Sequence, residues 1–404
     1  MFRRVLILSC VLSAWSVFVN GADRATGRDR PPPPPLSQHI CSLVITAEQV
    51  RPHIEFLASP ALAGRDGQGA IVAAEYIAKT LREAGLQPLF GDEYFQSIPD
   101  AVQSDGTQPV IGRNVGAIWP GTDPRLRGEV IVLAAHYDHL GVRRGTIHPG
   151  ADDNASGVSM LLETARYVSQ LPQKPRRSIA FVGFDMEEEL LYGSRWFVAH
   201  PPIPLSQMKL MVTADLIGRS LGDLPLPLVF MFGSEHAPAL RASIANVGIP
   251  SGLEVGRLGV DFIGTRSDYG PFRDQRIPFL FFSTGEHPDY HTPRDTPDRI
   301  EYDKLSRISS LMAQLVVQVA NGQEAPVWES QPAPDLEEAQ TMERVTQVML
   351  AEEEAGRKQL SATVRFVAGQ TLAKTRYMRE RGSLSPEERV WLRRSAQFLL
   401  FSAF

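Results

Sequence analysis

The most regular feature of the sequence is a series of short, continuous apolar runs separated by stretches with helical spacing. The apolar runs lie at 115–119, 130–134, 179–184, 210–214, 228–232 and 279–282. Apolar residues recur every three or four positions within 71–86, 158–171, 189–200, 238–247 and 305–320. Continuous apolar strands that alternate with helices are typical of a buried sheet in an α/β fold. The pattern predicts a mixed, mostly parallel central β-sheet flanked by helices on both faces.

The N-terminus departs from this pattern. Arg3-Arg4 precedes an apolar run from Val5 to Val19, and the small residues Gly21-Ala22 follow. This order is typical of a secretory signal peptide. The run has about 15 residues, fewer than the roughly 20 that cross a bilayer as a helix. We expect a signal peptide at 1–22 and an exported mature chain, periplasmic or extracellular, without a stable membrane span; an uncleaved anchor is the alternative.

Proline-containing breaks divide the rest of the chain. Residues 23–45 contain Pro31 to Pro35 and are expected to form an extended linker. A large α/β domain is then predicted over 46–325, with a helix start at Thr46. A second proline-containing break opens a C-terminal extension at 326–404, whose residues from 335 onward have a helical pattern throughout. The extension could cover the site, mediate dimerisation or fold separately, and the sequence leaves these alternatives and the oligomeric state open.

Composition narrows the function classes. The formal net charge is −5, which gives no support for a nucleic-acid-binding surface. Hydrophobic residues make up 43% of the 404 residues, enough for a substantial core. Cys10 and Cys41 are the only cysteines, which excludes a fold held by several disulfides. Function must therefore be inferred from local groups of polar side chains.

Side chains that can bind metal follow the apolar runs in five places. The segments are His136-Tyr137-Asp138, the GADDNASG segment at 150–157, Glu187-Glu188-Glu189, Asp215, and Tyr290-His291. In an open α/β sheet, ligands bind beyond the carboxyl ends of the strands. We therefore expect these distant segments to converge at one edge of the sheet.

Each segment alone also has an ordinary structural explanation. Asp, Asn and Ser within 150–157 suit a helix N-cap, and the glutamates at 187–189 suit the start of a helix. Together the segments supply carboxylates and imidazoles without thiolates, which fits zinc, cobalt or manganese in a catalytic rather than a structural site. Asp138 and Glu187 are additional carboxylates of the kind needed for ligand orientation and proton transfer.

The five segments, in this order, resemble the co-catalytic zinc metallopeptidases of clan MH, the aminopeptidase Y and bacterial leucyl aminopeptidase family. The resemblance covers roughly residues 46–321 and includes AAHYDHLG at 134–141, GADDNASG at 150–157, DLIGR at 215–219 and YHTP at 290–293. Ala63-Gly64-Arg65 and Ser267-Asp268 are further landmarks. The resemblance implies a zinc aminopeptidase-like fold, with the metallopeptidase catalytic domain at 46–325.

The metal ligands follow from the resemblance. It implies two Zn²⁺ per chain, with cobalt or manganese as substitutes. Asp153, rather than the preceding aspartate, would bridge the two ions. His136 and Asp215 would complete one metal site, and Glu188 and His291 the other. The peptide bond after the bridging aspartate is expected to be cis.

The remaining site residues are also taken from the resemblance. Glu187 would act as the general base for a hydroxide shared by the two ions, and Asp138 would orient His136. Tyr290 and Asp268 are candidates for contact with the substrate. The implied reaction is hydrolysis of a peptide bond, with release of an N-terminal residue from a peptide.

Two positions differ from the family pattern. Leu190 occupies a position where glycine is usual, and we expect a helix to tolerate it there. Tyr269 replaces a common histidine and is expected to alter the substrate pocket. The alternatives to an aminopeptidase are a glutaminyl-peptide cyclotransferase with one zinc, a carboxypeptidase or dipeptidase of the same fold, and a non-catalytic relative. Retention of every ligand position argues against the last of these.

Overall fold

The computed structural model describes residues 45–103 and 106–403. The signal peptide predicted at 1–22 and nearly all of the linker predicted at 23–45 lie outside the described residues, as do both cysteines. The helices are α1 (Ala47–Leu57), α2 (Gln68–Glu83), α3 (Gly157–Gln170), α4 (Tyr192–Ala199), α5 (Leu240–Val247), α6 (Tyr269–Asp274), α7 (Tyr302–Asn321), α8 (Leu336–Glu354), α9 (Ala362–Arg381) and α10 (Pro386–Ala403). No helix in this part of the chain is both long and apolar enough to cross a membrane.

The strands of the described residues form a nine-stranded sheet and a separate short pair. The nine strands are β1 (Gln87–Pro88), β2 (Phe95–Pro99), β3 (Val110–Trp119), β4 (Val130–His136), β7 (Ser178–Phe184), β8 (Met208–Ala214), β9 (Leu228–Phe232), β10 (Glu254–Leu258) and β11 (Phe279–Ser283). Their order is β1-β3-β7-β4-β8-β11-β9-β10, and β2 pairs with β3. The separate pair is β5 (Val142–Arg143) with β6 (Thr146–Ile147).

Strand directions confirm the predicted mixed, mostly parallel sheet. The central neighbours β7, β4, β8 and β11 are parallel to one another. β3 is antiparallel to β7. β1 and β2 are antiparallel to β3, so they run in the same direction as the four central strands. β9 and β10 run in the opposite direction, because β9 is antiparallel to β11 and parallel to β10. The carboxyl ends of the four central strands therefore meet at one edge.

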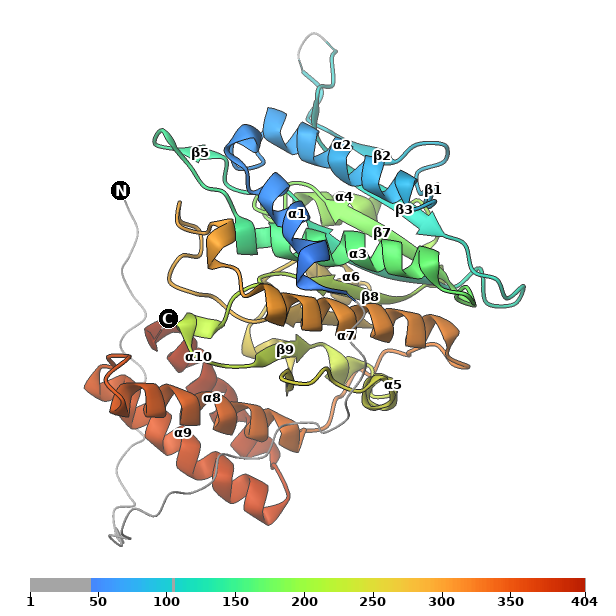
Figure 1. The fold of residues 1–404 in the computed structure, drawn as a ribbon. Helices are drawn as coiled ribbons and strands as arrows, with labels where there is room; N and C mark the ends of the chain where they lie inside the picture. The colour runs from blue at the N-terminus through green and yellow to red at the C-terminus, as the bar shows by residue number, and fades with distance from the viewer. Residues whose placement is uncertain (1–44, 104–105, 404) are drawn as a thin grey trace, which may run out of the picture. The chain divides into compact units, whose positions relative to one another are not determined.

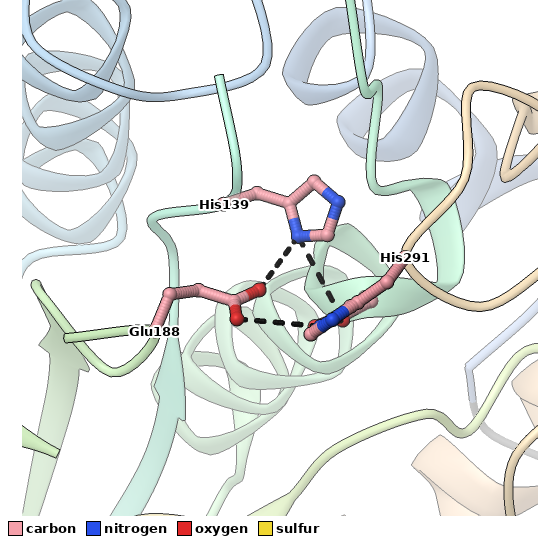
Figure 2. A group of neighbouring side chains, drawn as sticks. His139, Glu188 and His291 are labelled. Carbon is pink, nitrogen blue, oxygen red and sulfur yellow. Dashed lines mark hydrogen bonds and ion pairs between the residues drawn. The ribbon is translucent and has the colours of Figure 1, made fainter. Parts of the chain in front are cut away.

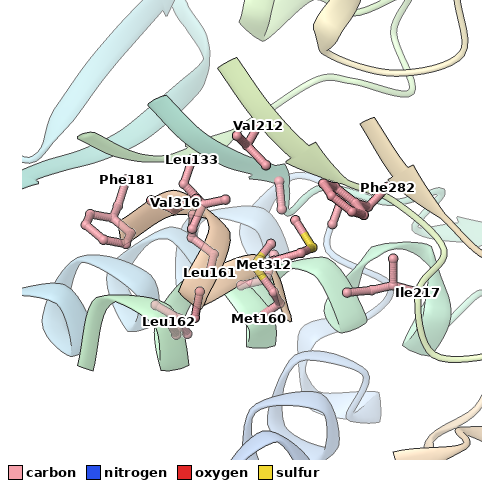
Figure 3. Close-up of a cluster of buried hydrophobic side chains, with 14 of the residues drawn as sticks. Leu133, Met160, Leu161, Leu162, Phe181, Val212, Ile217, Phe282, Met312 and Val316 are labelled. Carbon is pink, nitrogen blue, oxygen red and sulfur yellow. The ribbon is translucent and has the colours of Figure 1, made fainter. Parts of the chain in front are cut away.

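Side chains of β4 alternate between two hydrophobic cores, one on each face of the sheet. The first core joins Leu133 of β4 to Leu161 of α3 and Met312 of α7 (Figure 3). Figure 1 shows α1, α3 and α7 in front of the sheet. The second core joins Val132 of the same strand to Phe197 of α4 and to other residues of the opposite face. The continuous apolar runs in the sequence reflect this burial on both faces.

The C-terminal extension is helical, as predicted, and shares the second core with the sheet. Met342 of α8, Ala368 of α9 and Leu392 of α10 are buried in the same cluster as Phe232 of β9. Polar contacts also join α8 to β10: Arg344 pairs with Glu254 at 2.9 Å. The described residues of the sheet and of the extension belong to one compact unit.

The structure corrects the predicted helix at 189–200, which begins only at Tyr192. Leu190 and Leu191 both have φ of +62°, so the chain is turning rather than helical there. The position of Leu190 is therefore one where glycine is favoured for its backbone conformation, and the expectation that a helix accommodates the leucine is wrong. Its side chain is 77% exposed, so it meets no steric conflict.

Replacing Leu392 with alanine tests the shared core. Its side chain is fully buried in α10, and Leu→Ala changes at such sites destabilise by about 2–5 kcal/mol. We expect Leu392→Ala to destabilise the sheet and the extension together. Circular dichroism and tryptophan fluorescence should both report a single cooperative urea transition, with its midpoint at a lower urea concentration than in the wild type. Val390→Ala, at a 38% exposed position of the same helix, is the control. Two separate transitions in the wild type would contradict the shared core.

Candidate metal centre

The carboxyl ends of the four central strands bring the predicted ligands together. His136 is the last residue of β4, Asp215 follows β8, and Glu188 follows β7 after a short turn. His291 lies in the segment after β11, and Asp153 lies in the loop between β6 and α3. These five residues are scattered over more than 150 positions of the sequence, and the parallel arrangement of the strands places them at one edge.

The five side chains form two adjoining groups that share Asp153. Its Oδ1 lies 3.4 Å from Nε2 of His136, and that nitrogen is also 3.4 Å from Oδ1 of Asp215. The other oxygen of Asp153, Oδ2, lies 3.0 Å from Nε2 of His291. The same nitrogen of His291 is 3.3 Å from Oε2 of Glu188. One carboxylate thus faces two clusters, each with a histidine and a second carboxylate.

The donor atoms fit metal ions. Nε2 of His136 and Nε2 of His291 are buried, and neither has a hydrogen-bond partner among the described residues. Buried polar atoms without partners are costly in a protein interior, and a cation between imidazole and carboxylate would remove that cost. Among the described residues, two groups each have candidate ligand atoms that all lie within 4.8 Å of one another. One group is His139, Asp153, Glu188 and His291, and the other is His136, Glu187 and Asp215.

Asp152 and Asp153 have different surroundings, which separates their roles. The Oδ1 of Asp152 accepts a hydrogen bond from the backbone N–H of Gly218 at 2.5 Å, and its Oδ2 lies 3.4 Å from His287. Asp152 therefore holds neighbouring loops, whereas Asp153 faces the histidines of the candidate centre. The peptide bond between Asp153 and Asn154 is cis, which confirms that expectation.

Asp138 contacts the glutamate pair more closely than it contacts His136. Its two carboxylate oxygens accept hydrogen bonds from the backbone N–H groups of Glu187 and Glu188 at 3.1 and 3.2 Å. Nδ1 of His136 lies 3.6 Å from Oδ1 of Asp138, beyond ordinary hydrogen-bond distance, and 3.3 Å from its carbonyl oxygen. Asp138 therefore positions the turn that carries both glutamates, in addition to lying beside His136.

The crowding of acidic groups shifts their pKa values. Burial raises the pKa of Glu187 well above its usual range; His136 opposes this shift, whereas Asp215 and Asp268 add to it. Burial raises the pKa of Asp215 in the same way. Burial would also raise the pKa of Asp153, but the adjacent histidines outweigh it and hold that pKa well below its usual range. Such perturbed carboxyl groups in one cluster are typical of functional sites.

A buried arginine holds the loop that carries Asp153. Arg65 donates five hydrogen bonds to carbonyl oxygens, at distances of 2.6 to 2.9 Å; the acceptors belong to Leu57, Tyr137, Pro149, Gly150 and Asp153. Burial lowers the pKa of Arg65, and the carboxylates of Asp153 and Asp295 oppose that shift. The carboxylate of Asp295 also holds this loop in place, because it accepts hydrogen bonds from the backbone N–H groups of Asp152 and Asp153.

This geometry agrees with a sequence comparison. A model of peptidase family M28 matches residues 114–316, half of the chain, and that range contains every predicted ligand. The chain belongs to peptidase family M28. Aminopeptidase YwaD of Bacillus subtilis (strain 168) is 27% identical over 210 residues, which cover 49% of this chain and 43% of YwaD. The chain therefore matches less than half of that relative.

Solved structures support the fold. The LapA aminopeptidase of Legionella pneumophila superposes with a TM-score of 0.53 at 21% identity, covering 69% of this chain and 73% of LapA. The glutaminyl cyclase of Porphyromonas gingivalis gives the same TM-score at 20% identity, covering 68% of this chain and 98% of the cyclase. At these identities the similarities establish the fold alone.

The M28 resemblance led us to assign no role to His139, which the structure places in the centre. Its Nδ1 lies 2.9 Å from Oε1 of Glu188 (Figure 2). The same nitrogen is 3.7 Å from Oδ2 of Asp153. The side chain is buried, and its ring lies edge-on to that of His291 at 5.7 Å. The sequence contained a hint of this role, because His139 belongs to the same HYDH segment as His136. The spacing within that segment did not reveal which of its side chains point toward the other candidate ligands.

The two candidate substrate contacts have different surroundings. The ring of Tyr290 stacks on His291 at 3.9 Å, beside the metal ligands. Asp268 is fully buried, and its carboxylate oxygens lack hydrogen-bond partners among the described residues. Burial raises the pKa of Asp268 to about 7. Asp268 therefore belongs to the acidic cluster around Glu187, whereas Tyr290 lies against His291 and lines a neighbouring cavity.

Replacing Arg65 tests the support of the Asp153 loop. A lysine has one ammonium in place of the planar guanidinium, so Arg65→Lys cannot reach all five carbonyl oxygens. We expect a loss of about 2–6 kcal/mol in the free energy of unfolding, because an ammonium has three donors and at least two buried carbonyl oxygens lose theirs, at about 1–3 kcal/mol each. Urea denaturation measures this loss, and the exposed Arg125→Lys is the control. Equal stability of the two variants would show that the guanidinium is not needed.

Proposed function

We propose that this chain is a zinc-dependent exopeptidase, most specifically an aminopeptidase that releases N-terminal residues from peptides. The observation that carries the proposal is the position of Asp153, whose two oxygens face His136 on one side and His291 on the other. Membership of peptidase family M28 and the similarity to aminopeptidase YwaD support it. Peptides are accordingly the proposed substrates.

The proposed centre holds two zinc ions. His136, Asp153 and Asp215 would bind one ion, and Asp153, Glu188 and His291 the other, with cobalt or manganese as substitutes. The chemistry that zinc supplies when bound is polarisation of the scissile carbonyl and activation of a water molecule near neutral pH. His139, which contacts Glu188, would fix the orientation of that ligand.

Glu187 is the proposed proton carrier. Its carboxyl group lies in the group formed with His136 and Asp215, at the edge of the site. Burial raises the pKa of Glu187, which makes its carboxylate a stronger base; in that form it would accept a proton from the attacking water and pass it to the leaving amine. Asp138 positions it through the backbone N–H groups of the glutamate turn.

The proposed location is outside the cytoplasm. This part of the proposal depends on the basic and apolar pattern of residues 1–22. In that location the enzyme would release amino acids from extracellular or periplasmic peptides.

The discriminating experiment compares free and blocked substrates. We expect the purified chain with zinc to hydrolyse aminoacyl-p-nitroanilides that have a free α-amine but not their N-acetyl derivatives, and to lose activity with a chelator. Peptides that begin with glutamine test the cyclase alternative, which predicts pyroglutamate formation without hydrolysis. Hydrolysis of C-terminally free but N-blocked peptides would instead indicate a carboxypeptidase.

Glu187→Gln should reduce kcat by about 10²–10⁴-fold and leave the zinc content unchanged, because the amide keeps the size of the side chain but cannot carry the proton. Steady-state kinetics and metal analysis of the same preparation measure both quantities. Near-normal kcat would exclude Glu187 as the base. Glu189→Gln, at the exposed neighbouring position, is the matched control and should change neither quantity.

Glu188→Gln should lower the zinc content, because it removes a charged ligand next to His291. Metal analysis after dialysis against a defined zinc buffer measures the change. The two neighbouring glutamates are thus expected to give different phenotypes. Equal zinc loss from Glu187→Gln and Glu188→Gln would contradict the division of roles.

A further inference from the structure

A largely apolar cavity adjoins the candidate metal centre. Its volume is about 370 Å³, and Asp215 and Tyr290 contribute to its lining. Cavities that bind small ligands have volumes of roughly 300–1,000 Å³ and are mostly apolar with a few polar groups. Asp215 belongs to the proposed zinc ligands, and Tyr290 stacks on another of them, so the cavity begins where a substrate's scissile bond would lie.

The sheet supplies one wall of this cavity. Phe230 and Phe232 of β9 and Phe281 of β11 line it with aromatic side chains. Tyr269, which was expected to alter the substrate pocket, is not among the lining residues. Its ring is fully buried behind the wall and stacks on Phe279 at 5.0 Å. The effect of Tyr269 on a substrate stays a prediction, and the aromatic residues of β9 and β11 form this surface of the cavity.

The C-terminal extension supplies the opposite wall. Met342 and Val345 of α8, and Ala396 and Leu399 of α10, all line the cavity and are buried. Figure 1 shows α8 and α10 beside β9, at the end of the sheet away from α2. These helices lie outside the residues 114–316 that match the family, so this wall is a feature of this chain beyond the matched region.

Apart from the buried Asp215 beside the metal centre, the charged groups of the cavity lie where it opens to solvent. Arg266 and Glu286 line it, pair with each other at 3.4 Å, and are nearly half exposed. Away from Asp215 and Ser283 the buried part of the lining is apolar, so a charged side chain placed there would lose its hydration without finding a partner. The cavity therefore favours an apolar occupant.

We infer that this cavity receives the side chain of the substrate's N-terminal residue, and that α8 and α10 make it selective for large apolar side chains. The inference rests on the proposed function, because it takes the scissile bond to lie at the metal centre. Ala396 is the proposed specificity-determining position, because it is a small residue that the extension contributes to the lining of a cavity large enough for a leucine or phenylalanine side chain. The extension thus acts on substrate choice rather than on the chemistry.

Ala396→Leu tests this inference by filling the cavity from the extension. We expect kcat/KM for phenylalanyl- and leucyl-p-nitroanilide to fall at least about tenfold, and kcat/KM for the alanyl substrate to stay within about twofold. A single methylene in an apolar pocket changes discrimination by about 10–200-fold. Ala351→Leu makes the same substitution at an exposed position of α8 and should leave all three values unchanged.

Met342→Ala enlarges the cavity, whereas Ala396→Leu fills it. The result for Met342→Ala therefore does not depend on whether a larger side chain overpacks the core. Because its cavity is larger, kcat/KM for the tryptophanyl substrate should rise relative to that for the phenylalanyl substrate. Equal effects of Ala396→Leu on the alanyl and phenylalanyl substrates, together with an unchanged tryptophan-to-phenylalanine ratio in Met342→Ala, would overturn the inference.

A binding measurement separates this inference from the proposed function. Phenylalaninol and alaninol carry the same amine and cannot be hydrolysed, and calorimetry gives their Kd values. We expect the wild type to prefer phenylalaninol by at least about tenfold and Ala396→Leu to lose that preference. If the wild type hydrolyses no aminoacyl anilide, the proposed function fails, and the binding measurement alone tests the role of the cavity. Loss of the phenylalaninol preference in Ala396→Leu would then support that role. An equal preference in the wild type and in Ala396→Leu would overturn it.

Discussion

The guanidinium of Arg65 is the constraint on which the rest of the centre depends. It is fully buried and uses all five of its donors on carbonyl oxygens, including that of Asp153. A buried charge is tolerated only with such complete pairing. Because the five acceptors come from α1, the end of β4 and the Asp153 loop, one side chain fixes the distance between the bridging carboxylate and the strand that carries His136.

The fixed position of Asp153 gives the edge of the sheet an excess of negative charge. Asp153, Glu188, Asp215 and Glu187 lie around the buried ring of His136 and the partly exposed ring of His291, and Asp138 and Asp268 lie close to them. Carboxyl groups outnumber imidazoles in this space, and burial adds to their repulsion, as the raised pKa values of Glu187 and Asp215 indicate. Cations are the natural counterpart of such a cluster, which connects the packing of the fold to the proposed zinc chemistry.

The helical extension links the second core to the same site. Its helices bury Met342, Leu392 and Leu399 against the sheet, so they contribute to stability and at the same time form a wall beside Asp215. A surface of this kind can differ between relatives without any change in the metal ligands, because the ligands lie on strand ends and loops whereas the wall lies on separate helices. Selectivity and chemistry are thus carried by different parts of this chain.

The sequence by itself determined the sheet, the main helices and the convergence of His136, Asp153, Glu188, Asp215 and His291. Apolar runs report burial on both faces, and parallel strands must end at the same edge. Only the tertiary structure decided which neighbour in a polar run faces inward. It brought His139 into the centre and showed that Leu190 lies in a turn, whereas the family resemblance had already chosen Asp153 over Asp152. These outcomes depend on backbone dihedrals and on contacts between distant segments such as Arg65 and the Asp153 loop. The position of α8 and α10 beside the cavity likewise arises from packing between surfaces far apart in the sequence, which local pattern does not encode.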